Sequence, residues 1–229
     1  MILEGKVALI TGADGPIGVA TALRFAREGA VVVLNDIVSR HLERAAAQVE
    51  HEEGGKTLIV LGDVTRPPHV ERMVRETLDA FGRIDILVNN AGDNEEVALQ
   101  GATLCVQAIA PAMCERRWGR IITTSVISSV GNAALVTAAT SRGAVITMTK
   151  TFALEYARHG VTVNCVAPGA TMANVLPEVK ETLLALIPMG RIAEPREVAA
   201  AHVFLAADDA SYITGQVLYV DGGLSVETP

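Results

Sequence analysis

The sequence predicts an α/β protein with one doubly wound parallel sheet of about seven strands and helices on both faces. Short β-branched segments alternate with longer segments of helical period along the whole chain, a pattern typical of stacked βα units. The strand segments are continuously apolar, as expected when helices cover both faces of a sheet. No linker, composition shift or internal repeat interrupts residues 1–229, so we expect a single domain.

Each element follows from its own residues. Gly29 ends the first helix, because glycine readily takes the left-handed conformation there. Pro67 and Pro68 open the third helix, where a missing N–H group costs least. Strands are expected at Val7–Thr11, Val31–Asn35, Thr57–Leu61, Ile86–Asn89, Ile121–Ser125, Val161–Val166 and Val217–Val220. Helices are expected at about residues 16–28, 39–52, 67–81, 96–117, 137–158 and 195–207, with a short one near 178–187.

Composition excludes several classes of function. Half of the 229 residues are apolar and 3% are aromatic, which supplies a packed core but little surface for stacking on bases. Twenty-six acidic residues against 19 basic ones give a net charge of −7, which argues against nucleic acid or an anionic membrane as a partner. We therefore expect a small-molecule ligand or another protein as the partner.

The cysteines and the N-terminal sequence indicate the cellular compartment in which the protein is expected. Cys105, Cys114 and Cys165 lack metal-type spacing, so we expect reduced thiols and no metal site. The N-terminus lacks a signal-peptide pattern, and the longest uncharged stretch, Ile121–Ser141, is rich in serine and threonine. These features predict a cytoplasmic protein.

A glycine-rich loop, Thr11–Gly18, follows the first strand and opens the first helix. Gly12 allows a tight turn, Gly15 lets the backbone approach a pyrophosphate, and Gly18 lets the helix pack close to the sheet. The helix N-terminus adds N–H groups and the positive end of a dipole, although Pro16 removes one donor. The loop predicts a dinucleotide site of the Rossmann type; a merely tight turn is the structural alternative.

The nature of the dinucleotide is indicated by Asp36, at the end of the second strand and 18 residues after Gly18. A carboxylate there can accept hydrogen bonds from both hydroxyls of an adenosine ribose and would repel a 2′-phosphate. No basic residue immediately precedes Asp36, and Arg40 lies four residues on. NAD(H) is therefore expected in preference to NADP(H), unless Asp36 is only a solvated residue at a strand end.

Six motifs recur in one order along the chain: the Thr11–Gly18 loop, Gly-Asp-Val at 62–64, Asn-Asn-Ala-Gly at 89–92, Gly-Arg-Ile-Ile at 119–122, Val-Asn-Cys-Val-Ala-Pro-Gly at 163–169, and 213–223. On these residues the chain resembles the short-chain dehydrogenase/reductase family over nearly its whole length. The resemblance implies a homo-oligomer, a dimer or tetramer, with the helices at 96–117 and 137–158 as the subunit contact.

The resemblance also implies which residues contact the cofactor. Relatives carry a threonine near the pyrophosphate where this chain has Ala173, which leaves Thr171 as the substitute and predicts weakened or vestigial binding. The full set of implied contacts is Gly12, Asp14, Gly15, Ile17, Gly18, Asp36, Asp63, Val64, Asn90, Ala91, Gly92, Arg142, Pro168, Gly169 and Thr171.

The chemistry is where the chain departs from the family. By the resemblance, the catalytic Asn-Ser-Tyr-Lys set falls on Ala98, Ser125, Ala138 and Arg142, so only the serine is kept. Alanine has no ionisable proton, and loss of a positioned acid/base typically costs a factor of ~10²–10⁴ in rate. With a pKa above about 12, Arg142 can hold charge near a ribose but cannot shuttle protons. The catalytic residues expected to remain are Ser125 and Arg142.

Neither another tyrosine nor a histidine is expected to replace the missing acid/base. The three tyrosines belong to other segments of the chain, and none of the five histidines is expected near Ser125, which argues against a serine hydrolase. Only five residues separate Gly92 from Ala98, so one wall of the substrate cleft is expected to be trimmed.

Three functions stay open. The favoured one is a non-redox catalyst that speeds cyclisation, rearrangement or dehydration of a small-molecule intermediate by orienting it. The second is an NAD-dependent oxidoreductase in which water held by Ser125 supplies the proton. The third is a silent subunit that forms a hetero-oligomer with an active homologue, or a nucleotide-binding module.

Overall fold

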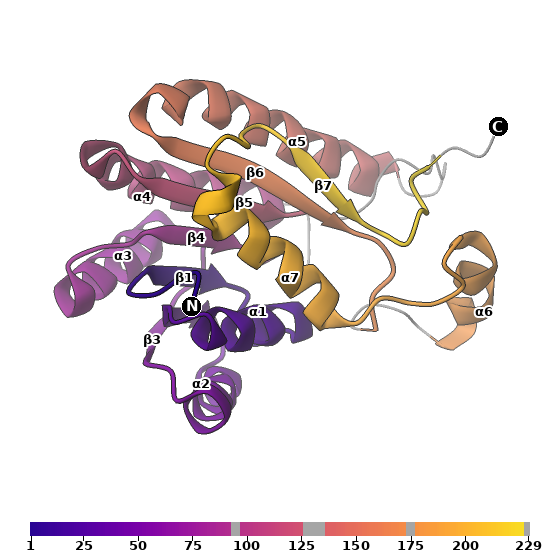
Figure 1. Cartoon of the computed structure of the whole chain (residues 1–229), viewed down its shortest axis with the longest axis horizontal. Helices are drawn as coiled ribbons and strands as arrows, with labels where there is room; N and C mark the ends of the chain where they lie inside the picture. The colour runs from indigo at the N-terminus through magenta and orange to yellow at the C-terminus, as the bar shows by residue number, and fades with distance from the viewer. Residues whose placement is uncertain (93–96, 126–135, 173–176, 227–229) are drawn as a thin grey trace.

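The computed structural model describes residues 1–92, 97–125, 136–172 and 177–226, and only the backbone at 136–142 and 177–179. Its strands form one parallel sheet in the order β3-β2-β1-β4-β5-β6-β7 (Figure 1). The predicted α/β class and doubly wound sheet are therefore confirmed. The strands are β1 Val7–Thr11, β2 Val31–Asp36, β3 Thr57–Leu61, β4 Ile86–Asn89, β5 Gly119–Thr124, β6 Val161–Pro168 and β7 Val217–Val220.

Helices cover both faces of the sheet (Figure 1). Those of one face, α1, α2 and α7, pack on the sheet through Phe25, Leu42 and Val198. On the other face α3, α4 and α5 pack through Met73, Ile109 and Phe152. The helices are α1 Pro16–Arg27, α2 Ser39–Glu53, α3 Pro67–Phe81, α4 Ala102–Arg116, α5 Val136–Tyr156, α6 Pro177–Leu186 and α7 Pro195–Ala206.

Two predicted boundaries change in ways that matter for the site. β5 ends at Thr124, so Ser125, expected as the last strand residue, lies just beyond it. The helix expected at 96–117 is divided into a π-helical turn, Val97–Gly101, and α4. A Cβ atom on Gly101 would lie 2.5 Å from Cγ2 of Val64, so the absence of a side chain lets this turn pack on the β3–α3 connection.

The segment Val97–Arg116 is the one described helix whose length and mean hydropathy, 1.5, would suit a membrane span. Its buried residues, including Cys105, Val106 and Met113, pack against the sheet. Core packing therefore accounts for part of its apolar character, since 39% of its 18-residue apolar window is buried.

A buried histidine joins α1, α7 and the end of β5 within the apolar cluster. His202 Nδ1 lies 2.9 Å from Thr21 Oγ1, and Nε2 lies 3.1 Å from Thr124 Oγ1. The Thr21 hydroxyl donates to the Ile17 carbonyl at 2.7 Å. Because a hydroxyl has one proton, Thr21 accepts from Nδ1–H, and Nε2 accepts from Thr124. Burial lowers the pKa of His202 to about 3, so the imidazole is neutral.

His202 makes stability depend on pH. Its folded pKa lies below the unfolded value of about 6.5, so stability present above pH ~6.5 is lost as the pH falls. Between pH ~7.5 and ~5 the free energy of unfolding of the wild type, relative to His202→Gln, should fall by about 2 kcal/mol in urea titrations. His202→Leu provides a second reference that fills the same space. A difference that does not change with pH would contradict the assignment.

Candidate functional site

The glycine loop lies against the end of β4 at the carboxyl edge of the sheet. Gly12 has φ 61°, and a Cβ atom on it would lie 2.7 Å from the Ala91 nitrogen. A Cβ atom on Gly18 would lie 2.2 Å from the Gly12 carbonyl oxygen. At Gly15 the nearest heavy atom would be 3.7 Å away. The fold itself therefore requires glycine at positions 12 and 18, whereas the space beside Gly15 is open.

Thr11 ties this loop to β4. Its Oγ1 accepts hydrogen bonds from the backbone N–H groups of Asn90 and Ala91, each at 3.1 Å. Asn90 Nδ2 in turn donates to the Gly12 carbonyl at 2.9 Å. Three residues predicted to contact a cofactor thus meet at one point. Thr11 was not predicted as a site residue; the available signal was a hydroxyl side chain at the end of the first strand, directly before Gly12.

Asp36 lies in an acidic cluster. Its Oδ1 accepts from the Ile37 N–H at 2.7 Å, while Asp14 Oδ2 lies 3.1 Å from His41 Nδ1. Burial and the hydrogen bond with the Asp14 carboxyl raise the pKa of Asp36 to about 6. An ionised Asp36 offers acceptor oxygens to hydroxyl groups of a ligand. The contribution of His41 was not anticipated from the sequence.

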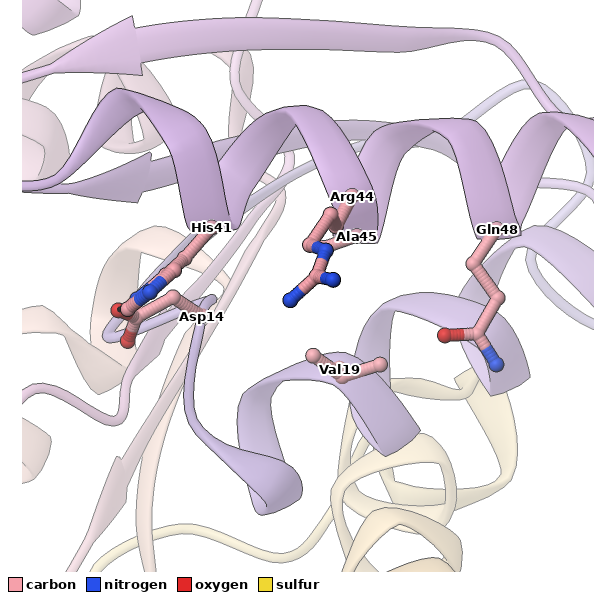
Figure 2. Close-up of a pocket in the computed structure, with 6 residues that line it drawn as sticks. All are labelled: Asp14, Val19, His41, Arg44, Ala45 and Gln48. Carbon is pink, nitrogen blue, oxygen red and sulfur yellow. Dashed lines mark hydrogen bonds and ion pairs between the residues drawn. The ribbon is translucent and has the colours of Figure 1, made fainter.

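A surface pocket of about 280 Å³ lies beside this cluster, between α1 and α2. Figure 2 shows Asp14 and His41 adjacent to each other at one end, with Arg44 and Gln48 extending from α2 and Val19 facing them from α1. The pocket thus borders the glycine loop through Asp14.

Asp63 and Val64, two further residues predicted to contact the cofactor, make contacts within the protein itself. The Asp63 carboxylate accepts from the Thr65 N–H at 2.9 Å and from Thr65 Oγ1 at 2.7 Å, which lowers the pKa of Asp63. Val64 is buried beneath Gly101. Their expected contact with an adenine stays a prediction.

Ser125 stands at the carboxyl edge beside other buried polar groups. Its N–H donates to the Val166 carbonyl at 2.8 Å, and the residue is 5% exposed. Asn89 and Thr123 are register partners on β4 and β5, and Ser125 follows two residues after Thr123 on the same face. Within the described part of the chain, the side chains of all three have no hydrogen-bond partner. Such groups in a folded protein are often completed by a ligand or water.

None of the three tyrosines, all of which are described, is placed to act on Ser125. Tyr156 ends α5, stacks on Phe152 at 5.7 Å and packs near Cys114, just before β5 begins, so it lies at the opposite edge of the sheet. Burial raises its pKa to about 12. Tyr212 is fully exposed. Tyr219 is on β7, two strand spacings from β5, or about 10 Å.

The remaining predicted residues are distributed around this edge. Ala98 packs on Gly92, with 3.4 Å between its Cβ and a Cβ built on the glycine. Pro168 pairs with Val220 at the end of β6. Thr171 is fully buried beside Ala193. Ile17 is half-buried on α1, Gly169 follows Pro168, and the side chains of Ala138 and Arg142 lie outside the described residues.

One expectation about histidine is wrong. His202 was not expected near Ser125, yet its Nε2 bonds to Thr124, the preceding residue. The strand order alone did not reveal this contact between His202 and Thr124, because it depends on how α7 packs on the sheet. α7 covers the face opposite to the one from which the Ser125 side chain projects. Thr124 and Ser125 point to opposite faces, so His202 cannot act as a base for the serine.

The thiols contribute no nucleophile. Burial raises the pKa of Cys105 and of Cys165 to about 12, and burial also raises the pKa of Cys114. All three are therefore neutral thiols near pH 7. Among the residues that the structure describes, no group of three or more His, Cys, Asp or Glu side chains could hold a metal ion.

Substitution can distinguish the roles of Gly18 and Gly15 in the loop. We expect Gly18→Ala to lower the free energy of unfolding by more than about 2 kcal/mol, because its methyl group meets the backbone of Gly12 and Ala13. Gly15→Ala should change it by less than about 1 kcal/mol, since the site is open and φ is negative there. Urea unfolding measures both. Equal losses would contradict the assigned roles.

The acidic cluster predicts a second measurable effect. Asp14→Asn should lower the pKa of Asp36 from about 6 toward its ordinary value, because the neighbouring carboxyl is removed. Carboxyl carbon NMR shifts followed with pH report this directly. Asp79→Asn, an exposed change on α3, serves as the control and should leave Asp36 unchanged. An unaltered Asp36 titration in Asp14→Asn would show that burial alone sets its pKa.

Known proteins resemble this chain over nearly its whole length. The chain is 40% identical to the (2S)-[(R)-hydroxy(phenyl)methyl]succinyl-CoA dehydrogenase subunit BbsD of Thauera aromatica, covering 99% of both chains. It is 41% identical to the 3-oxoacyl-[acyl-carrier-protein] reductase FabG of Thermotoga maritima, covering 99% of this chain and 100% of the relative.

Solved structures agree with these relatives. The crystal structure of levodione reductase matches with a TM-score of 0.91 and 30% identity, over 99% of this chain and 100% of that one. A family model described as short chain dehydrogenase matches residues 6–183. The chain therefore belongs to the short-chain dehydrogenase/reductase family.

Proposed function

We propose that this chain binds NAD(H) but does not perform tyrosine-dependent hydride transfer, and that it serves as the partner subunit of an active dehydrogenase. The observation that carries the proposal is the placement of the tyrosines, none of which stands beside Ser125. We assign the family's tyrosine and lysine positions to Ala138 and Arg142. A carbonyl held by Ser125 would then lack an adjacent proton donor.

Retention of a dinucleotide rests on the glycine loop and the acidic cluster. The family binds NAD(P)(H), and the open space at Gly15 suits a pyrophosphate at the start of α1. Asp36 and Asp14 favour a free ribose over a 2′-phosphate, because a phosphate beside two carboxyls is repelled. NAD(H) is accordingly the preferred form in the proposal.

The assignment as a subunit draws on two comparisons. The Thauera aromatica relative is itself named as a subunit of a dehydrogenase. Its alignment with this chain of 229 residues spans 246 positions, so part of the relative has no counterpart here. The short connection from Gly92 to Ala98 is where we place part of this loss, which would open the substrate cleft. Oligomer contacts through α4 and α5, and a cytoplasmic location, stay predictions.

A second candidate keeps catalysis at Ser125. The side chains of Asn89, Thr123 and Ser125, which have no hydrogen-bond partner among the described residues, favour it, because they could bind a ligand oxygen or a water that supplies a proton. The same groups would orient the intermediate of a non-redox reaction. The relatives are named as dehydrogenases and reductases, which favours an oxidoreductase over a non-redox catalyst.

Binding and turnover together test the proposal. Calorimetry should show that NADH binds and that Asp36→Ala weakens it by about tenfold or more, by loss of the ribose acceptor. The wild type should not oxidise NADH with acetoacetyl-CoA, a 3-oxoacyl thioester. The double variant Ala138→Tyr with Arg142→Lys should gain this activity. Wild-type turnover abolished by Ser125→Ala would instead support the second candidate.

The subunit assignment has its own measurement. Co-expression with a homologue from the same genome that retains the catalytic tyrosine should yield a mixed oligomer, detected by light scattering and by mass spectrometry of the intact complex. The homologue expressed alone is the control. Separate homo-oligomers after co-expression would contradict the partner role and leave the binding of NADH to be judged by calorimetry.

A further inference from the structure

We infer that His202 is a positioning residue that fixes Ser125 relative to α1, the helix that carries the dinucleotide loop. The imidazole bridges Thr21 on α1 and Thr124 at the end of β5, at 2.9 and 3.1 Å. His202 is fully buried within the apolar cluster between the sheet and the helices α1 and α7. The inference rests on the proposed binding of NAD(H) only for the role of α1.

Ser125 depends on its neighbours for its position. Its side chain has no partner among the described residues, and its N–H donates to the Val166 carbonyl. β5 ends one residue earlier, at Thr124. The second restraint on this strand end is the hydrogen bond from the Thr124 hydroxyl to His202 Nε2. Fixing Thr124 fixes the backbone from which the Ser125 side chain projects to the other face of the sheet.

The hydrogen bond between His202 and Thr21 connects the imidazole to the helix that carries the dinucleotide loop. Thr21 lies three residues after Gly18 on α1, and its hydroxyl also donates to the Ile17 carbonyl. Gly18 contacts the backbone of Gly12 so closely that no side chain fits between them. A continuous series of contacts thus leads from the loop through Thr21, His202 and Thr124 to Ser125.

Hydrogen bonds are directional, which is why a histidine can fix the positions of Thr21 and Thr124 where an apolar side chain would not. Apolar packing tolerates small displacements, whereas a donor at Nδ1 and an acceptor at Nε2 define the distance and the orientation of both threonines. Both ring nitrogens are satisfied in one tautomer, so the bridge is complete without water or an ion. Burial lowers the pKa of His202, which maintains this neutral tautomer at ordinary pH.

Amide hydrogen exchange tests the inference in the protein without ligand. Thr124→Val keeps the shape of the side chain but removes the hydrogen bond to His202. The Ser125 amide should then exchange about tenfold faster, which is the effect of losing one hydrogen bond. His202→Val should do the same, and His202→Gln, which can donate and accept, should restore most of the protection. Thr77→Val removes a comparably buried hydroxyl on α3 and should leave Ser125 unchanged.

A purely structural role predicts a different pattern. In that case exchange at Ser125 would follow global stability, measured by urea unfolding, in all variants including Thr77→Val. That result would overturn the inference, as would an unchanged Ser125 amide in Thr124→Val.

Addition of NADH separates this inference from the proposed function. In the wild type, NADH should increase protection of the Ser125 amide, and in Thr21→Val this increase should be lost while the Kd for NADH changes by less than about threefold. An increase of wild-type size in Thr21→Val would overturn the coupling to α1. If calorimetry shows no NADH binding, the proposed function fails, while the ligand-free exchange data still decide whether His202 positions Ser125.

Discussion

The contact between the first βα loop and the end of β4 is the constraint on which the carboxyl edge of the sheet depends. Gly12 and Gly18 meet the backbone at distances that exclude a side chain. The Thr11 hydroxyl collects the N–H groups of Asn90 and Ala91 in the same place. Backbone amides that would otherwise be unpaired are satisfied there.

Two chemically different environments extend from this contact. On the β2 side, Asp36 and Asp14 form a partly buried acidic cluster with His41 close by. On the β5 side, the groups are neutral hydroxyls and an amide, with Ser125 at the edge. The first environment suits recognition of ribose hydroxyls. The second suits binding of an oxygen atom, but it contains no described group that could exchange a proton near pH 7.

The pattern of residues determined the secondary structure because that information is local. β1, β3, β4, β7 and α3 have the predicted bounds, since apolar stretches and flanking glycine or proline define them. The glycine loop was equally readable, because its spacing and its place between a strand and a helix are both visible in the chain. Ser125 was predicted as part of β5 but lies just beyond it, since pairing with β6 ends at Thr124.

Taken alone, the sequence predicted the parallel α/β class, the glycine loop and Asp36 as the candidate ribose acceptor, and it assigned Ala138 to the position of the family's tyrosine. Tertiary structure decided that Thr11 ties the loop to β4, that Asp14 and His41 join Asp36, and that His202 reaches the neighbour of Ser125 from α7. These contacts join residues distant along the chain. Local periodicity carries no information about such pairs, because side-chain distances across the fold are set by the packing of helices on the sheet.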